Sequence, residues 1–134
     1  MTAPTLYGIA VDDAHLYLAT NDANAGTILR LPKVATDAGT FDTIATGQKC
    51  PWAIAVDDRH VYWVNRVTTT RAGSVMRVAR DGSCPAGLPC PEVLVGPGVP
   101  ASDVPSGMVL LGNSIYFTTS GTGPNNGAVW KLAK

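Results

Sequence analysis

Short apolar runs recur along this 134-residue chain and are separated by Gly, Pro, Asn and Asp. Runs of this length are typical of strands, and the separating residues favour turns. No segment shows the period of about 3.6 residues that is typical of an amphipathic helix. The pattern therefore predicts an all-β protein built from many short strands.

One arrangement of strands occurs three times in the chain. The copies begin with similar stretches, which are YGIAVDDAHLYLAT from Tyr7, WAIAVDDRHVYWVN from Trp52 and SGMVLLGNSIYFTT from Ser106. A polar loop and a second signature follow, namely GTILRLPK from Gly26, GSVMRVAR from Gly73 and GAVWKLAK from Gly127. A recurring unit of this size is typical of β-propellers, in which each blade is one small sheet.

Each copy predicts up to four strands. The first strands are expected at residues 8–11, 53–56 and 107–110, the second at 16–20, 61–65 and 115–119, the third at 27–31, 74–78 and 128–132, and the fourth at 41–45 and 92–95. The first two strands of a copy are joined by Asp12-Asp13, Asp57-Asp58 or Gly112-Asn113. These residue types favour tight turns, so each copy is expected to begin with a hairpin.

The first strands carry apolar residues on both faces. Gly8 and Ala10 alternate with Ile9 and Val11, so both faces are expected to be buried. Strands near the crowded axis of a propeller need such a pattern. The sequence therefore predicts a single propeller segment of four-stranded blades over residues 1–134, with blade 1 at about 6–49, blade 2 at about 50–103 and a partial blade 3 at about 104–134.

The second copy carries motifs of a known family. YWVN from Tyr62 stands where the YWTD family of six-bladed β-propellers has Tyr-Trp-Thr-Asp, and VMR from Val75 is followed by DG from Asp81. PWAIAVD from Pro51 is similar to the opening of a blade in that family. The other copies match through Tyr17, Arg30, Tyr116 and Lys131. The last motif position holds Thr20, Asn65 or Thr119 where the family has Asp. The chain thus resembles YWTD propellers, and more distantly NHL-like propellers.

The resemblance implies a closed ring of six blades, and the three blades of this chain would form half of that ring. Two chains related by a two-fold axis would close such a ring as a homodimer, and the alternative is that the remainder of a longer propeller supplies the other blades. Uncharacterised bacterial secreted proteins have similar tandem blades, which implies an extracellular or periplasmic location. The N-terminal residues MTAPTLYG lack the pattern of a secretory signal.

The charge balance limits the classes of partner. Lys and Arg together number 10, as do Asp and Glu, so the formal net charge is zero. A nucleic-acid-binding protein normally has a basic surface, and a membrane-spanning helix needs about 20 consecutive apolar residues. In this sequence the Lys and Arg residues are scattered, and no apolar run reaches that length. We therefore expect no nucleic-acid partner and no membrane span.

Two of the three cysteines, Cys84 and Cys90, lie in one loop, DGSCPAGLPCPE. Their separation is long enough for a local disulfide, which we expect if the compartment is oxidising. Metal ligation is the alternative, but zinc sites usually have closer pairs and more ligands. Cys50 is then left over, and we expect it to be a small, partly buried residue.

Candidate catalytic groups are few. His15 and His60 lie beside turn aspartates at equivalent positions of two copies. Equivalent positions on neighbouring blades lie apart around a ring, so these residues are not expected to share one ion. Gluconolactonase-like propellers hold a metal with Glu, Asn and Asp at the channel mouth, whereas the only glutamate here, Glu92, falls in a predicted outer strand. There is no G-x-S-x-G motif. We therefore expect no catalytic residue, no metal site and no cofactor.

Loops that differ between copies are the expected place for ligand binding, because a rigid scaffold positions them. The candidates at the first strands are Tyr7, Trp52 and Ser106, and those in the following loops are Asn21, Asp22, Arg66, Arg71 and Asn125. Tyr7 and Trp52 are suited to stacking on a sugar ring or on the apolar face of a peptide. The sequence predicts a non-enzymatic binding or scaffold module for a protein, peptide or glycan ligand. The alternatives are half of a lactonase- or lyase-like enzyme and a purely structural repeat.

Overall fold

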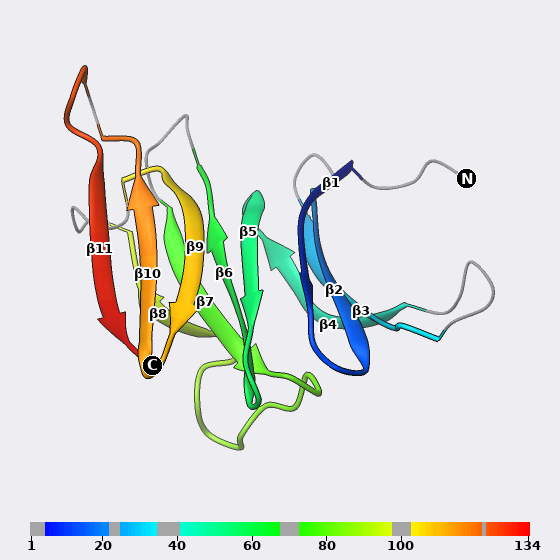
Figure 1. The fold of residues 1–134 in the computed structure, drawn as a ribbon. Coiled ribbons are helices and arrows are strands. Elements are labelled where there is room, and N and C mark those ends of the chain that lie inside the picture. Colours follow the sequence, from blue (N-terminus) through cyan, green and yellow to red (C-terminus); the bar gives the residue numbers. More distant parts are fainter. Residues whose placement is uncertain (1–4, 22–24, 35–40, 68–72, 98–102, 122) are drawn as a thin grey trace.

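The computed structural model describes residues 5–21, 25–34, 41–67, 73–97, 103–121 and 123–134. Within these ranges the chain forms eleven strands (Figure 1). They are β1 (Thr5–Val11), β2 (His15–Asn21), β3 (Gly26–Pro32), β4 (Asp42–Gln48), β5 (Pro51–Val56), β6 (His60–Asn65), β7 (Ser74–Ala79), β8 (Glu92–Val95), β9 (Pro105–Leu111), β10 (Ser114–Thr119) and β11 (Ala128–Ala133). In this part of the chain no helix is long and apolar enough to cross a membrane. The predicted all-β class is confirmed.

The strands form three antiparallel sheets in chain order. Sheet 1 has the order β1-β2-β3-β4, sheet 2 the order β5-β6-β7-β8 and sheet 3 the order β9-β10-β11. Every strand expected from the sequence overlaps one of these strands. Figure 1 shows the sheets one after another, with β5 between β1 and β9. The first strands of the three sheets therefore lie side by side.

Aspartate side chains shape the first hairpin of sheets 1 and 2. The Oδ1 atom of Asp12 accepts hydrogen bonds from the backbone N–H groups of Ala14 and His15, at 2.8 and 2.7 Å. Asp57 accepts the corresponding bonds from Arg59 and His60. Such side-chain bonds to backbone groups two and three residues ahead fix a tight turn. The third hairpin uses Gly112 instead, whose φ of +54° favours glycine.

The three sheets share one cross-strand register. Tyr17 lies opposite Arg30, Tyr62 opposite Arg77 and Tyr116 opposite Lys131. The first strand also pairs equivalently, because Ala10 faces Tyr17 as Ala55 faces Tyr62. Side chains alternate along a strand, so equal register places equivalent residues on the same face of each sheet.

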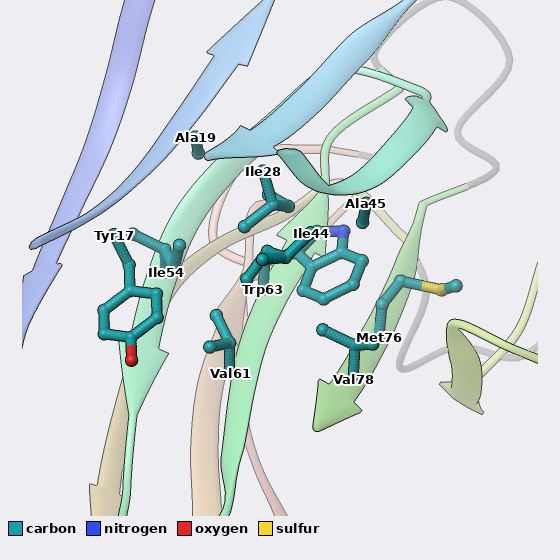
Figure 2. Packing of buried hydrophobic residues seen from close by; sticks show 10 residues of the cluster. All are labelled: Tyr17, Ala19, Ile28, Ile44, Ala45, Ile54, Val61, Trp63, Met76 and Val78. Atoms are coloured by element: carbon teal, nitrogen blue, oxygen red, sulfur yellow. The ribbon is translucent and has the colours of Figure 1, made fainter. Parts of the chain in front are cut away.

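A hydrophobic cluster fills the junction between sheets 1 and 2, and Figure 2 shows Trp63 at its centre. Its buried members are Tyr17, Ala19, Ile28, Ile44 and Ala45 from sheet 1, and Ile54, Val61, Trp63, Met76 and Val78 from sheet 2. Trp63, Val61 and Ile28 have no exposed surface. Burial of apolar surface stabilises a fold by about 25 cal/mol per Å². Such a cluster is therefore the main contribution that holds the two sheets together.

A second cluster fills the junction between sheets 2 and 3. Tyr62, Val64 and Val75 from the other face of sheet 2 pack with Ile115 and Phe117 of sheet 3. Sheet 2 is therefore buried on both faces, as the apolar composition of β6 requires.

A buried polar network joins the end of sheet 1 to sheet 2. The Oε1 atom of Gln48 accepts hydrogen bonds from Trp63 Nε1 at 3.0 Å and from Asn65 Nδ2 at 3.2 Å. Asn65 also donates to Ser74 Oγ at 3.0 Å. Asn65 occupies the last position of the YWTD-like motif, so the residue there makes a contact between sheets.

We expect the Gln48→Leu substitution to lower the free energy of unfolding by about 1–3 kcal/mol, because the buried Trp63 donor would lose its acceptor. Urea unfolding followed by circular dichroism measures the change. Thr46→Val, at an exposed position of the same strand, is the control and should stay within about 0.5 kcal/mol. Equal stability of the two variants would contradict the role given to Gln48.

Candidate functional site

Three of the predicted ligand-binding residues lie together at one edge of the molecule. The rings of Tyr7, on β1, and Trp52, on β5, are stacked with centroids 4.5 Å apart and planes inclined by 29°. Arg66, which follows β6, places its Cζ atom 4.6 Å from the centre of the Trp52 ring. We call these three residues the aromatic platform. It is built from two sheets, so it exists only when sheets 1 and 2 are packed.

A glycine allows the two first strands to approach closely. A Cβ atom at Gly8 would overlap the carbonyl oxygen of Trp52 and would lie 3.1 Å from a methyl carbon of Ile54. The register between β1 and β2 also shifts between Leu6 and Gly8, and such an irregularity re-aims the adjacent side chain. Tyr7 lies at this irregularity. Gly8 and the shifted register together bring the Tyr7 ring onto Trp52.

The backbone of Arg66 is held by the segment that enters sheet 2. Its N–H donates to the carbonyl oxygen of Cys50 at 2.9 Å, and Asn21 Nδ2 donates to the Cys50 sulfur at 3.0 Å. Cys50 has a φ of +54°, in the left-handed region. Cys50 therefore connects two predicted binding residues, and the sequence had indicated only a small, partly buried side chain there.

The guanidinium of Arg66 lies over the Trp52 ring. Its Nε atom is buried and has no hydrogen-bond partner among the described residues. A cation over a Trp ring is attracted by the ring's π electrons, typically by about 0.5–2 kcal/mol. The ring thus holds the charge in place.

The remaining predicted residues are placed differently. Ser106 donates to the carbonyl oxygen of Val104 at 3.2 Å and lies 3.3 Å from Ser120 Oγ, so its contacts are within sheet 3 and its loops. Asn125 is exposed, with a φ of +64°. Asp22 and Arg71 lie outside the described residues. The structure thus brings together Tyr7, Trp52 and Arg66, with Asn21 linked through Cys50.

The turn aspartates at the opposite edge form contacts between sheets. Asp12 pairs with Arg80 of sheet 2 at 3.2 Å, and Asp57 pairs with Lys134, which follows sheet 3, at 2.9 Å. Each aspartate also accepts a hydrogen bond from the tyrosine of its own sheet, Tyr17 or Tyr62. No group of three or more His, Cys, Asp and Glu side chains is arranged to hold a metal within the described ranges.

The environment shifts the ionisation of these groups. Burial by itself raises the pKa of Asp57, but the N–H groups of His60 and Arg59 and the ammonium of Lys134 outweigh it and lower the pKa to about 2. Burial and the charge of Asp57 raise the pKa of Tyr62 to about 12. The pair is therefore an ionised carboxylate that accepts from a neutral phenol throughout the physiological range.

Acid should weaken the first hairpin of sheet 2 and its contact with sheet 3. The folded pKa of Asp57 is about 2 and its ordinary value is 3.8, so its contribution is present above the ordinary pKa and is lost as the pH falls towards the folded value. We expect a loss of about 2 kcal/mol between about pH 5 and pH 2 from this group. Urea unfolding at a series of pH values measures this loss. In Asp57→Asn the slope of the free energy of unfolding against pH should be smaller over this range. An unchanged slope in Asp57→Asn would refute this assignment.

Two surface depressions lie away from the aromatic platform. One, of about 550 Å³, runs between β7, β8 and the loop that contains Cys90, and includes His60 and Arg77 in its lining. The other, of about 460 Å³, surrounds the Asp57–Lys134 pair. Neither includes Tyr7, Trp52 or Arg66. The aromatic platform is therefore not part of the wall of either depression.

The cysteines follow the expected pattern. The Sγ atoms of Cys84 and Cys90 are bonded to each other, with their Cα atoms 5.6 Å apart. Cys50 is a free, partly buried thiol. The disulfide closes the loop after β7 that borders the larger depression.

Comparison of the chain with protein-family models and with curated proteins finds no match in either set. The resemblance to YWTD propellers therefore remains a prediction, based on residues such as Tyr62 and Arg77.

Proposed function

We propose that this chain is a non-enzymatic binding module of the β-propeller type, and that the aromatic platform binds a protein, peptide or glycan ligand. Three antiparallel sheets in the same strand order, with their first strands side by side, support the propeller architecture. The observation that carries the function is the convergence of Tyr7, Trp52 and Arg66 from two sheets.

The platform offers two kinds of contact. Tyr7 is 41% exposed, so its ring presents apolar surface to a sugar ring or an apolar side chain. Arg66 adds a fixed positive charge, which suits a carboxylate. The favoured ligand therefore presents a carboxylate beside a ring or an apolar group.

The chemical groups of the platform favour binding over catalysis. Enzymes generally enclose the reacting groups and exclude water from them. The platform lies outside both depressions, and its side chains are two aromatic rings and a guanidinium.

Calorimetric titration with two probes tests the proposal. The probes are an oligosaccharide of uronic acids and a peptide that alternates aromatic and acidic residues. We expect one of them to bind, and Arg66→Gln and Tyr7→Ala to weaken its binding at least tenfold. Arg59→Gln makes the same charge change at an 80%-exposed side chain beyond the other end of β5, and should leave binding unchanged.

Two results would count against the proposal. If Arg66→Gln bound the probe as tightly as the unsubstituted chain, the aromatic platform would not be the binding site. Cleavage or lactone hydrolysis of a probe would favour the enzymatic alternative instead.

A further inference from the structure

Two sheet faces at the ends of the array are apolar and exposed. On sheet 1, Ile9 and Val11 are 64% and 55% exposed. On sheet 3, Val109, Leu111 and Val129 are 63%, 71% and 74% exposed. Contiguous apolar surface of this kind usually marks an interaction site.

Each exposed face is equivalent to a face that is buried elsewhere in the same chain. Ile9 pairs with Leu18 as Ile54 pairs with Trp63, and Ile54 and Trp63 pack against sheet 1. The exposed face of sheet 1 is therefore the kind of face that receives a preceding sheet.

Sheet 3 shows the opposite kind of face. Val129 lies opposite Thr118 as Val75 lies opposite Val64, and Val75 and Val64 pack against the following sheet. The exposed face of sheet 3 is therefore the kind that receives a next sheet. The two uncovered faces are complementary to each other, and one chain cannot join its own two end sheets across sheet 2.

From this complementarity we infer that a second copy of the chain covers both faces. Sheet 3 of each copy packs on sheet 1 of the other, which repeats the junctions between sheets 1 and 2 and between sheets 2 and 3. A two-fold axis makes both new junctions identical and leaves no uncovered face. This inference uses the propeller-type packing and does not depend on ligand binding at the aromatic platform.

The new junctions differ from the internal ones in their charge. The position of Asp12 and Asp57 is occupied by Leu111 in sheet 3. Lys33, which follows β3 as Arg80 follows β7, donates instead to the carbonyl oxygen of Asp12 in its own sheet, at 3.2 Å. The junction between copies therefore lacks the aspartate ion pair and is apolar, so its stability should depend little on salt.

Light scattering over a wide range of protein and salt concentrations tests the inference. The expected mass is twice the 13.9 kDa of one chain, about 28 kDa, at low and at high salt. A mass of 13.9 kDa at every concentration, or a mixture of larger species, would overturn it. In the first case the faces would be left for other blades of a longer protein.

Charge variants identify the faces involved. Ile9→Lys and Val129→Glu should each give a folded protein with the mass of one chain, 13.9 kDa, because each substitution places a charge in both new junctions. Mixing the two variants should restore the doubled mass, since one junction is then unsubstituted and the other pairs Lys with Glu. Leu88→Glu, at a 65%-exposed position in the disulfide loop, should leave the doubled mass unchanged. A doubled mass in either single variant, or no recovery on mixing, would refute the assignment of these faces.

Discussion

Replacing Trp63 with Ala is expected to lower the free energy of unfolding by about 3–5 kcal/mol. Trp63 has no exposed surface and lies at the centre of the cluster between sheets 1 and 2 (Figure 2). Its removal leaves a cavity that strands of two sheets would have to collapse to fill. It also removes the donor to Gln48. Domains have total stabilities of about 5–15 kcal/mol, so this single change should remove a large share.

Urea unfolding followed by far-ultraviolet circular dichroism measures the loss. Trp63→Phe retains part of the ring volume but no donor, and should lose clearly less stability than Trp63→Ala. A change below about 1 kcal/mol in Trp63→Ala would contradict the packing of sheets 1 and 2, since surface positions typically change stability by less than that.

Replacing Gly8 with Ala is expected to lower stability by about 1–3 kcal/mol and to disturb the aromatic platform as well. The added methyl group overlaps the carbonyl oxygen of Trp52, which is backbone and cannot rotate away. β1 must therefore move from β5, and this movement separates the stacked rings of Tyr7 and Trp52. The substitution thus links packing near the first strands to the geometry of the aromatic platform.

Near-ultraviolet circular dichroism of Gly8→Ala should show reduced signal from the stacked rings, alongside reduced stability in urea. Gly96→Ala is the matched control, because its added Cβ would meet only Val93, at an ordinary 3.6 Å. If Gly8→Ala were as stable as Gly96→Ala, the close approach of β1 and β5 would be wrong.

Local pattern was sufficient to predict the strands and the hairpins. The apolar run at residues 61–65 predicted β6, and Asp12 and Asp57 predicted turns that their side chains do form. Both features depend on residues close in sequence, so they can be recognised without knowing which sheet packs on which.

Contacts between sheets could not be predicted in the same way. The Gln48–Trp63 hydrogen bond and the Arg80–Asp12 ion pair join residues of different sheets. Their partners are fixed by the rotation and spacing of whole sheets, and the local pattern of residues does not reveal either quantity. The variation between copies did indicate Tyr7, Trp52 and Arg66 as candidates, but their mutual stacking became visible only once β1 lay beside β5.

These contacts give the two edges of the molecule different roles. At one edge the aspartates are occupied by backbone, tyrosine and cationic partners, and they join neighbouring sheets. At the other edge Tyr7 remains exposed and Arg66 lies over the Trp52 ring. Equivalent residues thus hold the sheets together, and residues that differ between sheets form the proposed binding surface.

Ligand binding at the aromatic platform is tested most directly by the indole N–H signals of a nitrogen-15-labelled chain during titration with the uronic-acid oligosaccharide or the aromatic-acidic peptide. Trp63 and Trp130 donate to Gln48 and Thr119 within the fold, so their signals serve as internal controls. We predict that the Trp52 signal shifts and saturates while the other two stay in place. Saturable binding that leaves the Trp52 signal unmoved would contradict the proposed site.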